Sequence, residues 1–511
     1  MKIERTRNTA RNMTFGMMEK LFSLLFSFVS RTVLIYYLGI DFVGLNSLFG
    51  SVLSVLSLAE LGIGSALVYF MYQSIANDNT QEINALLKIY KKCYFFIGLS
   101  VLVVGVIILP IIPHLIREAT IPKGINIFVI YFVNLLSSVF SYWFYAYKNS
   151  LISAFQRNDI VSKINTILNF LQSILQIIVL LFFRNYYFFC IIPMAICVAR
   201  NISIHFITKR EFPQYYPCGD LSNEIKTEIK TKVFALFVNK FGNVVANSVD
   251  SLVISAFLGL TILGIYNNYY YILSSLGMIL VLYYSSMSAG VGNSIATESV
   301  EKNYSDFQRL FFAQSWIIGW SSICLLCLYQ PFIELWVGKQ NQFDFGVVVA
   351  FVLYYYFWRI QDIVYVYKEA AGLWEKDKYC SIVGPVFNLI LNIILVKKIG
   401  IYGIIISTLL MNLIIMIPWR TWNLFSSYFK KGLKKFYAQL IGYTIVNMII
   451  ALFTYYICDK ISLNGLSALL LKAAVCVIVP NLLLGGIYCK QDIFKDTYAF
   501  MKSKLIVLVK K

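Results

Sequence analysis

A row of polar side chains interrupts an apolar stretch, VNKFGNVVANSVDSLV. Lys240, Asn243, Asn247 and Asp250 follow one another at steps of three, four and three residues. On a helix of 3.6 residues per turn, these steps keep all four side chains within an arc of about 80°. The shared face therefore carries an ammonium group, two amides and a carboxylate, and it must meet water, a polar solute or a charged partner.

Comparable polar faces interrupt other apolar segments. If these segments lie in a membrane, a charge at mid-bilayer costs about 3 kcal/mol on insertion scales, so such residues usually face a partner or water. Charges spread over several helices suit a solvated cavity better than isolated pairs. The candidate cavity residues are Arg31, Glu60, Lys240, Asn243, Asn247, Asp250, Arg359 and Asp362.

A purely structural role is the alternative for these faces. Arg359 and Asp362 are three residues apart and could pair with each other, while Lys240 could meet Asp250 or Glu60. Amide side chains also join membrane helices without any further function. We favour that role for a row of amides in the fifth apolar segment, namely Asn165, Asn169, Gln172 and Gln176.

The composition indicates that the apolar segments span a membrane. Of the 511 residues, 59% are hydrophobic and only 14% are charged, whereas a soluble protein carries about a quarter charged residues. A spanning helix needs about 20 mainly apolar residues, and this window finds fourteen candidates. They run at about 14–38, 43–73, 90–113, 125–147, 160–183, 186–207, 232–258, 263–293, 309–330, 345–367, 379–396, 401–424, 435–457 and 466–488.

The net charge of +19 is explained by topology. With the N-terminus inside, 31 of the 44 Lys and Arg residues fall in inner segments, 7 in outer segments and 6 in spans. Lys and Arg gather in cytoplasmic loops, so we predict a multi-pass membrane protein with both termini cytoplasmic. Anionic lipid head groups are expected partners. Nucleic acid is not, because no stretch is polar enough to form a basic soluble face.

Two pairs of similar segments predict that the chain contains duplicated halves. YYLGIDFVGLNSLFGSVLSV at 36–55 resembles AFLGLTILGIYNNYYYILSS at 256–275, and AFQRNDIVSKINTILNFLQS at 154–173 resembles GLWEKDKYCSIVGPVFNLIL at 372–391. The offsets agree within about two residues, which indicates a repeat. We predict an all-α membrane fold of two six-helix bundles in pseudo-twofold repeat, with a cavity between them. The predicted parts are a first bundle at 1–208, a cytoplasmic connector at 209–231, a second bundle at 232–424, and two added helices with a basic tail at 425–511.

Enzyme chemistry finds no support in the sequence. The outer loops are at most about 16 residues long and the connector about 25, which leaves no room for a catalytic domain. His114 and His205 are the only histidines and lie in different segments, and no phosphate-binding GxxxxGK[ST] motif is present. Cys324 and Cys327 form a CxxC pair in an apolar run without a second ligand pair nearby. We therefore expect the cysteines to be small buried hydrophobic residues, and no metal or cofactor.

Three segments, in order and spacing, resemble the bacterial polysaccharide-biosynthesis flippases of the Wzx type. They are YYLGIDFVGLNSLFGSVLSVLSLAELGIGSALVYFMY, VDSLVISAFLGLTILGIYNNYY and AAGLWEKDKYCSIVGPVFNLILNIILVKKIGIYGIIISTLL. That family belongs to the superfamily of the MATE-type multidrug antiporters and the lipid II flippases. The resemblance covers about residues 10–425 and implies two six-helix bundles plus two further helices.

The resemblance also implies a location and a function: movement of an undecaprenyl-diphosphate-linked oligosaccharide from the inner to the outer leaflet of the bacterial cytoplasmic membrane, for O-antigen, capsule or exopolysaccharide synthesis. Arg31, Lys240 and Arg359 would attract the diphosphate. Glu60, Asp250 and Asp362 would titrate or bind Na⁺ if transport is coupled to an H⁺ or Na⁺ gradient. The polysaccharide polymerase machinery would be a partner.

Three alternatives remain beside this reading. A MATE-type antiporter exporting cations should have a cavity dominated by carboxylates, whereas the embedded charges here are balanced. A lipid II flippase would also have fourteen helices. A membrane-embedded glycosyltransferase or polymerase is disfavoured by the short outer loops.

Overall fold

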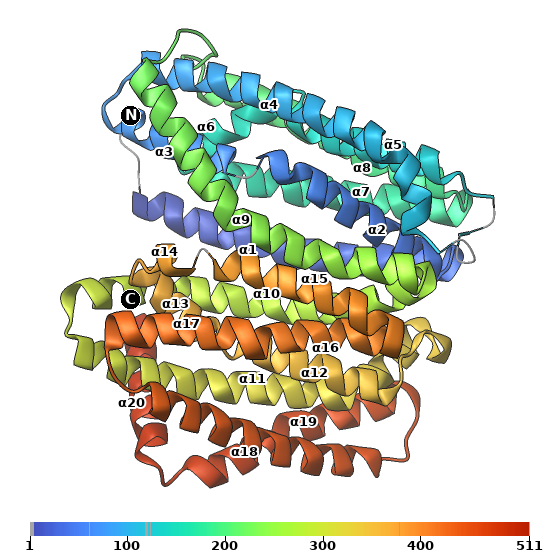
Figure 1. The fold of residues 1–511 in the computed structure, drawn as a ribbon, viewed down its shortest axis with the longest axis vertical. Coiled ribbons are helices and arrows are strands. Elements are labelled where there is room, and N and C mark those ends of the chain that lie inside the picture. The colour runs from blue at the N-terminus through green and yellow to red at the C-terminus, as the bar shows by residue number, and fades with distance from the viewer. Residues whose placement is uncertain (1–4, 61, 118–120, 123, 378, 510–511) are drawn as a thin grey trace. The chain divides into compact units, whose positions relative to one another are not determined.

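The structure is a computed structural model that describes residues 5–60, 62–117, 121–122, 124–377 and 379–509. Throughout the described residues the regular structure is helical, and Figure 1 follows the helices along the chain. The chain forms two compact units, residues 1–267 and 268–511. The helix α10 (Leu260–Thr297) begins in the first unit and continues into the second.

The first unit holds the helices before α10. They are α1 (Arg5–Tyr37), α2 (Ile40–Leu56), α3 (Ile63–Ala76), α4 (Thr80–Ile108), α5 (Ile127–Tyr142), α6 (Asn149–Ala154), α7 (Asn158–Phe182), α8 (Tyr186–Glu211) and α9 (Asn223–Phe257). Short 3₁₀ turns lie at Ser57–Glu60, Leu109–Leu115 and Ala146–Lys148.

The second unit holds the later helices. They are α11 (Val300–Val337), α12 (Phe345–Arg359), α13 (Asp362–Ala370), α14 (Trp374–Asp377), α15 (Cys380–Ile399), α16 (Ile401–Met411), α17 (Ile417–Leu424), α18 (Leu433–Asp459), α19 (Gly465–Tyr488) and α20 (Asp492–Val509). A 3₁₀ turn lies at Lys339–Asn341, and π-helical turns lie at Asn412–Met416 and Phe425–Phe429.

Polar caps set several helix starts. Asn79 accepts a hydrogen bond from the Glu82 N–H at the start of α4, and its amide donates to the Glu82 carboxylate at 3.0 Å. Ser222 and Ser299 accept from backbone N–H groups in the same way at the starts of α9 and α11. Each cap satisfies a donor that has no partner within the helix.

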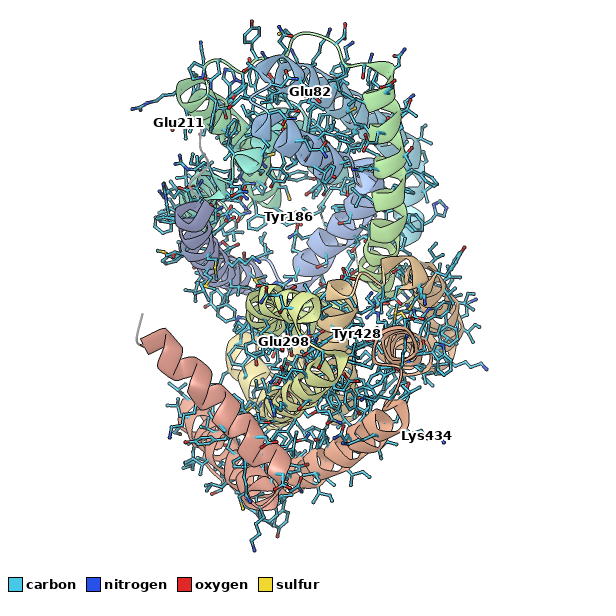
Figure 2. All side chains as sticks on the ribbon, turned by 90° about the vertical axis from the view of Figure 1, so that its left-hand side faces the viewer. Glu82, Tyr186, Glu211, Glu298, Tyr428 and Lys434 are labelled. Atoms are coloured by element: carbon cyan, nitrogen blue, oxygen red, sulfur yellow. The ribbon has the colours of Figure 1, made fainter. Side chains whose placement is uncertain are left out.

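The apolar helices confirm a multi-pass membrane protein. Among the described residues, ten helices are long and apolar enough to cross a membrane, or eleven if the bent pair Ile127–Tyr142 and Ala146–Ala154 is one span. Side chains project outward from the helices (Figure 2), and large apolar ones such as Phe182 and Leu482 are 76% and 70% exposed. The predicted all-helical fold is confirmed, while the count of fourteen spans is not.

Three of the fourteen predicted spans are not among the counted helices. Helices occur at all fourteen predicted positions, but the second is divided into α2 and α3, which are only 17 and 14 residues long. The long helices α1 and α9 are not among the counted spans, although Val244–Phe257 within α9 forms a shorter apolar helix. By length and hydropathy alone, the divided segment α2–α3 and the helices α1 and α9 are therefore not counted as spans.

The internal repeat is visible in the spacing of the helices. Equivalent helices begin at a nearly constant offset, which is 220 residues for α2 and α10, 220 for α4 and α11, and 218 for α5 and α12. The predicted offset of about 220 is thus followed by the helix starts as well as by the sequence.

Two glycines at equivalent repeat positions lie in reciprocal contacts between α2 and α10. A β-carbon at Gly44 would collide with the carbonyl oxygen of Leu260, and one at Gly264, 220 residues later, would collide with that of Ile40. Asp41 beside this contact accepts a hydrogen bond of 2.6 Å from the Thr261 hydroxyl. The absence of side chains thus lets the starts of α2 and α10 approach closely, inside the first unit.

The connector between α8 and α9 is short and docked. Its non-helical part is residues 212–222, because α8 and α9 both extend into the predicted 209–231 segment. The Lys88 ammonium on α4 bonds Asp220 at 3.1 Å and lowers the pKa of that carboxyl. Contacts group α9 with the first unit, whereas the repeat makes it the first helix of the second half. The bundle limits at 208 and 232 remain a prediction.

Candidate functional site

A broken helix positions Glu60. The α2 helix tightens into a 3₁₀ turn that ends at Glu60, and α3 begins at Ile63 after Gly62, whose φ of 92° is left-handed. A β-carbon at Gly62 would lie 2.7 Å from the Val233 carbonyl oxygen of α9, so the break requires glycine for space as well as for conformation. Irregular backbone at membrane depth is tolerated only where protein covers it or a water-filled cavity adjoins it.

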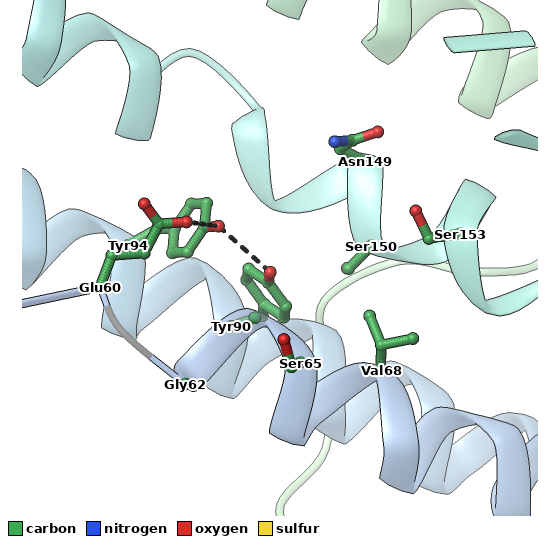
Figure 3. Close-up of a pocket in the computed structure, with 10 residues that line it drawn as sticks. Glu60, Gly62, Ser65, Val68, Tyr90, Tyr94, Asn149, Ser150 and Ser153 are labelled. Carbon is green, nitrogen blue, oxygen red and sulfur yellow. Dashed lines mark hydrogen bonds between the residues drawn. The ribbon is translucent and has the colours of Figure 1, made fainter. Parts of the chain in front are cut away.

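A cavity of about 550 Å³ opens at this break. Hydroxyl, amide and carboxylate groups dominate its walls, and α6 contributes Asn149, Ser150 and Ser153 (Figure 3). The remaining lining residues are Glu60, Gly62, Gly64, Ser65, Val68, Tyr90 and Tyr94. Such a surface can hydrogen-bond a hydroxylated ligand, and its one carboxylate can hold a cation or a proton.

A hydrogen-bond chain orients the carboxylate in this cavity. The buried Tyr90 hydroxyl donates to the Tyr94 hydroxyl at 3.2 Å, and Tyr94 donates to Glu60 at 2.7 Å, as the dashed lines in Figure 3 show. A β-carbon at Gly64 would lie 2.9 Å from the Tyr90 hydroxyl, so this glycine leaves room for the chain. Among the side chains that the structure describes, no cation lies within ion-pair distance of Glu60.

Arg31 and Asp250 both reach the first turns of α10. The Arg31 guanidinium donates to the Asn267 carbonyl at 3.0 Å, and Asp250 accepts from the Tyr266 hydroxyl at 3.2 Å. Both side chains are half-buried. Two residues 219 positions apart in the sequence are thus bound to neighbouring residues of one helix.

Arg359 and Asp362 lie at a second helix break, between α12 and α13. They form an ion pair of 3.5 Å, as the structural interpretation predicts, and only 8% of the Arg359 side chain is exposed. The guanidinium lies 3.7 Å from the centre of the Trp358 ring, and a β-carbon at Gly277 of α10 would collide with it. Its Nε atom has no hydrogen-bond partner within the described part of the chain. A cation and a spare donor are therefore held in a buried site.

An amide from α11 stabilises this second break. Gln314 donates to the Arg359 carbonyl at 2.6 Å and accepts from the Ile363 N–H at 3.1 Å, replacing backbone bonds that the break removes. In the first unit, Asn201 of α8 similarly donates to the Phe140 and Trp143 carbonyls where α5 ends. These two breaks occupy equivalent positions of the repeat.

Sequence reasoning missed the polar neighbours of the second break. Gln361 donates to Asn412 at 2.9 Å and accepts from the Arg420 guanidinium at 3.1 Å. Arg420 lies within the helix α17, inside the predicted span 401–424. The next basic residue, Lys430, lies ten residues further along the chain, so no local pattern signalled this contact.

Two buried acids at equivalent repeat positions were also missed. Asp159 is fully buried, with the Arg11 and Arg157 guanidinium groups at 2.7 and 3.0 Å. The similar segments 154–173 and 372–391 align Asp159 with Asp377, which is also buried and pairs with Lys368. The alignment itself was the signal, because an acid kept in both halves of an otherwise basic segment is unusual. Both clusters are fully paired and indicate a structural role.

The structure describes the helix that carries three of the predicted residues, but not their side chains. Lys240, Asn243 and Asn247 belong to α9, but their side chains lie outside the described residues. The structure therefore pairs Arg359 with Asp362, places Arg31 and Asp250 against neighbouring residues of α10, and leaves Glu60 in its own cavity. In the row of amides, Asn165 donates to Glu19 of α1 and Asn169 accepts from Arg200 of α8, both at 2.8 Å. These contacts favour the helix-joining role.

Comparisons with known proteins follow the fold. No model of a protein family matches the chain, and no curated protein matches it in sequence. Among solved structures, the lipid II flippase MurJ in an inward closed conformation is similar, with a TM-score of 0.68, 16% identity, and coverage of 93% of this chain and 98% of that one. An inward-facing multidrug resistance MATE family transporter of the MOP superfamily has a TM-score of 0.62, 15% identity, and coverage of 83% and 99%.

A MOP superfamily transporter from Pyrococcus furiosus is also similar, with a TM-score of 0.54, 14% identity, and coverage of 83% of this chain and 96% of that one. The chain therefore has the fold of these transporters and flippases. At these identities the likeness establishes the fold and leaves the Wzx-type resemblance as a proposal.

Proposed function

We propose that the protein is a flippase for an undecaprenyl-diphosphate-linked oligosaccharide, which it moves from the inner to the outer leaflet of the cytoplasmic membrane by alternating access. The observation that carries the proposal is the extent of the fold match: MurJ covers 93% of this chain, and the MATE and MOP transporters compared above cover 83%. MurJ is itself named a lipid II flippase.

The chemistry of the described residues supports this substrate class. A sugar diphosphate cannot cross hydrocarbon, whereas its polyprenyl tail never needs to leave it. Arg31 and Arg359 carry guanidinium groups. Such groups bind phosphate oxygens with paired charge-assisted hydrogen bonds. The hydroxyl- and amide-rich walls of the Glu60 cavity suit a sugar, which is itself covered with hydroxyl groups.

A lipid II flippase is the second candidate, favoured by the similarity to MurJ itself. A MATE-type cation antiporter is the third, favoured by the Glu60 carboxylate, which has no cationic partner among the described side chains. All three share the fold, so the substrate must be decided by transport. Coupling to an H⁺ or Na⁺ gradient would use Glu60, Asp250 or Asp362.

The decisive experiment compares three substrates in proteoliposomes of the purified protein. Undecaprenyl-diphosphate-linked oligosaccharide, lipid II and a cationic dye are each followed from one side of the membrane to the other. We expect the oligosaccharide to move, and Arg31→Ala and Asp250→Ala to abolish its movement at normal protein abundance. Movement of lipid II or of the dye alone would replace the proposal with the corresponding alternative. In cells, unchanged delivery of sugar repeats after gene deletion would also refute it.

A further inference from the structure

Four of the ten cysteines come together in the second unit. Cys324 and Cys327 belong to α11, Cys458 lies at the end of α18, and Cys476 lies in the middle of α19. The sulfur atoms of Cys327, Cys458 and Cys476 lie within 4.8 Å of one another, and those of Cys458 and Cys476 are 4.0 Å apart. The CxxC pair has no further cysteine ligands nearby in the sequence. In the folded chain, α18 and α19 supply them as Cys458 and Cys476.

These distances suit a shared metal ion. With metal–sulfur bonds of about 2.3 Å, ligand sulfurs around one ion lie about 4 Å apart. The three sulfurs would need to approach by less than about 1 Å to reach that geometry. Thiolate ligands select soft cations such as Cu⁺ and Zn²⁺ over the harder Mg²⁺ or Ca²⁺.

The scaffold holds the three thiols in place. Cys327, Cys458 and Cys476 are 4%, 2% and 0% exposed. The Trp320 indole of α11 donates to the Cys476 carbonyl at 2.9 Å, and the Cys324 sulfur lies 3.9 Å from the same oxygen. The ligands thus sit on packed helices rather than loops, which favours a defined geometry.

A polar cavity of about 420 Å³ reaches the cluster and offers an entry path. Cys327 and Cys458 lie in its wall together with the carboxylates of Glu334 and Asp459 and the ammonium of Lys472. The carboxylates can attract a cation toward the thiols. Lys472 is one helical turn from Cys476 and can balance the excess negative charge of three thiolates around one small cation.

We propose that Cys327, Cys458 and Cys476 bind one soft d¹⁰ cation, and that Cu⁺ fits best because three thiolates complete its trigonal shell. Single buried cysteines such as Cys190 and Cys380 act as small hydrophobic residues. The cluster differs from them because three helices converge on it and a charged cavity leads to it. This site is independent of the proposed transport function.

The test uses the reduced, full-length protein in lipid nanodiscs under anaerobic conditions. Cu⁺ is supplied as its complex with a chromophoric chelator, whose absorption reports transfer to the protein. We expect one equivalent to transfer and X-ray absorption to show sulfur neighbours only. Cys327→Ser, Cys458→Ser and Cys476→Ser should each weaken binding at least about tenfold, which is about 1.4 kcal/mol.

Matched controls separate this site from other thiols. Cys190→Ser removes a buried cysteine in the first unit, and Cys489→Ser removes an exposed one, so both should retain wild-type binding. If a serine variant fails to fold, the alanine variant at that position keeps the apolar packing and replaces it. No transfer to the wild type, or equal binding by all variants, would overturn the proposal. A disulfide within the cluster that resists the reductant would also overturn it.

Discussion

The buried guanidinium group of Arg359 contacts three neighbouring residues that fit it. Gly277 leaves space for the guanidinium, Trp358 covers it, and Asp362 pairs with it at 3.5 Å. Burial makes such a pair costly to break from one side, because the remaining charge loses its partner. The same burial makes the site a strong anion attractor if the pair opens to a diphosphate.

Charge removal at this pair should separate stability from transport. Arg359→Gln should lower the free energy of unfolding by about 3 kcal/mol, because Asp362 is left unpaired. The double variant Arg359→Gln/Asp362→Asn should regain most of that stability, which thermal unfolding in nanodiscs measures. We expect both variants to be inactive in the proteoliposome assay. An active double variant would show that the pair is only structural.

Glu60 should matter through its charge. Glu60→Gln keeps the size of the side chain and an acceptor for the Tyr94 hydroxyl but removes the charge, so we expect transport to fall at least about tenfold, or about 1.4 kcal/mol in barrier. Glu82→Gln makes the same change at the first turn of α4, where the carboxylate only accepts from Asn79. It should transport at the wild-type rate. Equal rates for both variants would exclude Glu60 from the mechanism.

At the scale of elements, the helix breaks are the least predictable feature. The break after Glu60 is signalled locally by Gly62, whose φ is positive. The break between Arg359 and Asp362 has no Gly or Pro and depends on Gln314, which lies 45 residues away from Arg359 in the sequence. Helix positions follow from local hydropathy and were predicted, whereas a break stabilised by a distant amide leaves no local pattern.

Close approach of α2 and α10 requires Gly44 but not Gly50. Both glycines belong to α2, but a β-carbon at Gly44 would collide with the Leu260 carbonyl, while one at Gly50 would meet nothing within 4 Å. Gly44→Ala should therefore destabilise by about 1–3 kcal/mol. Gly50→Ala should be neutral or stabilising by up to about 1 kcal/mol, because alanine favours helices. Thermal unfolding of the two variants tests this, and equal melting temperatures would contradict the contact.

At the scale of the whole molecule, the distribution of Lys and Arg predicts that both termini are cytoplasmic. Cys489 provides a natural probe, because it is exposed and lies just after α19. A membrane-impermeant maleimide should label it in inverted vesicles but not in intact spheroplasts. Lys339→Cys, exposed between α11 and α12, should show the opposite pattern. Labelling of Cys489 from outside would reverse the topology, and Cys489→Ser controls for other thiols.

The sequence by itself determined that the chain is an all-helical membrane protein, where its helices lie and that it contains a repeat, because hydropathy and spacing are local properties. It also marked Arg31, Glu60, Arg359 and Asp362 as polar residues in apolar surroundings. Only the tertiary structure decided their partners. Tyr94 reaches Glu60 across 34 residues, and Cys476 joins Cys327 from another helix. Such contacts depend on which helix faces pack together, and no periodic pattern within one segment records that.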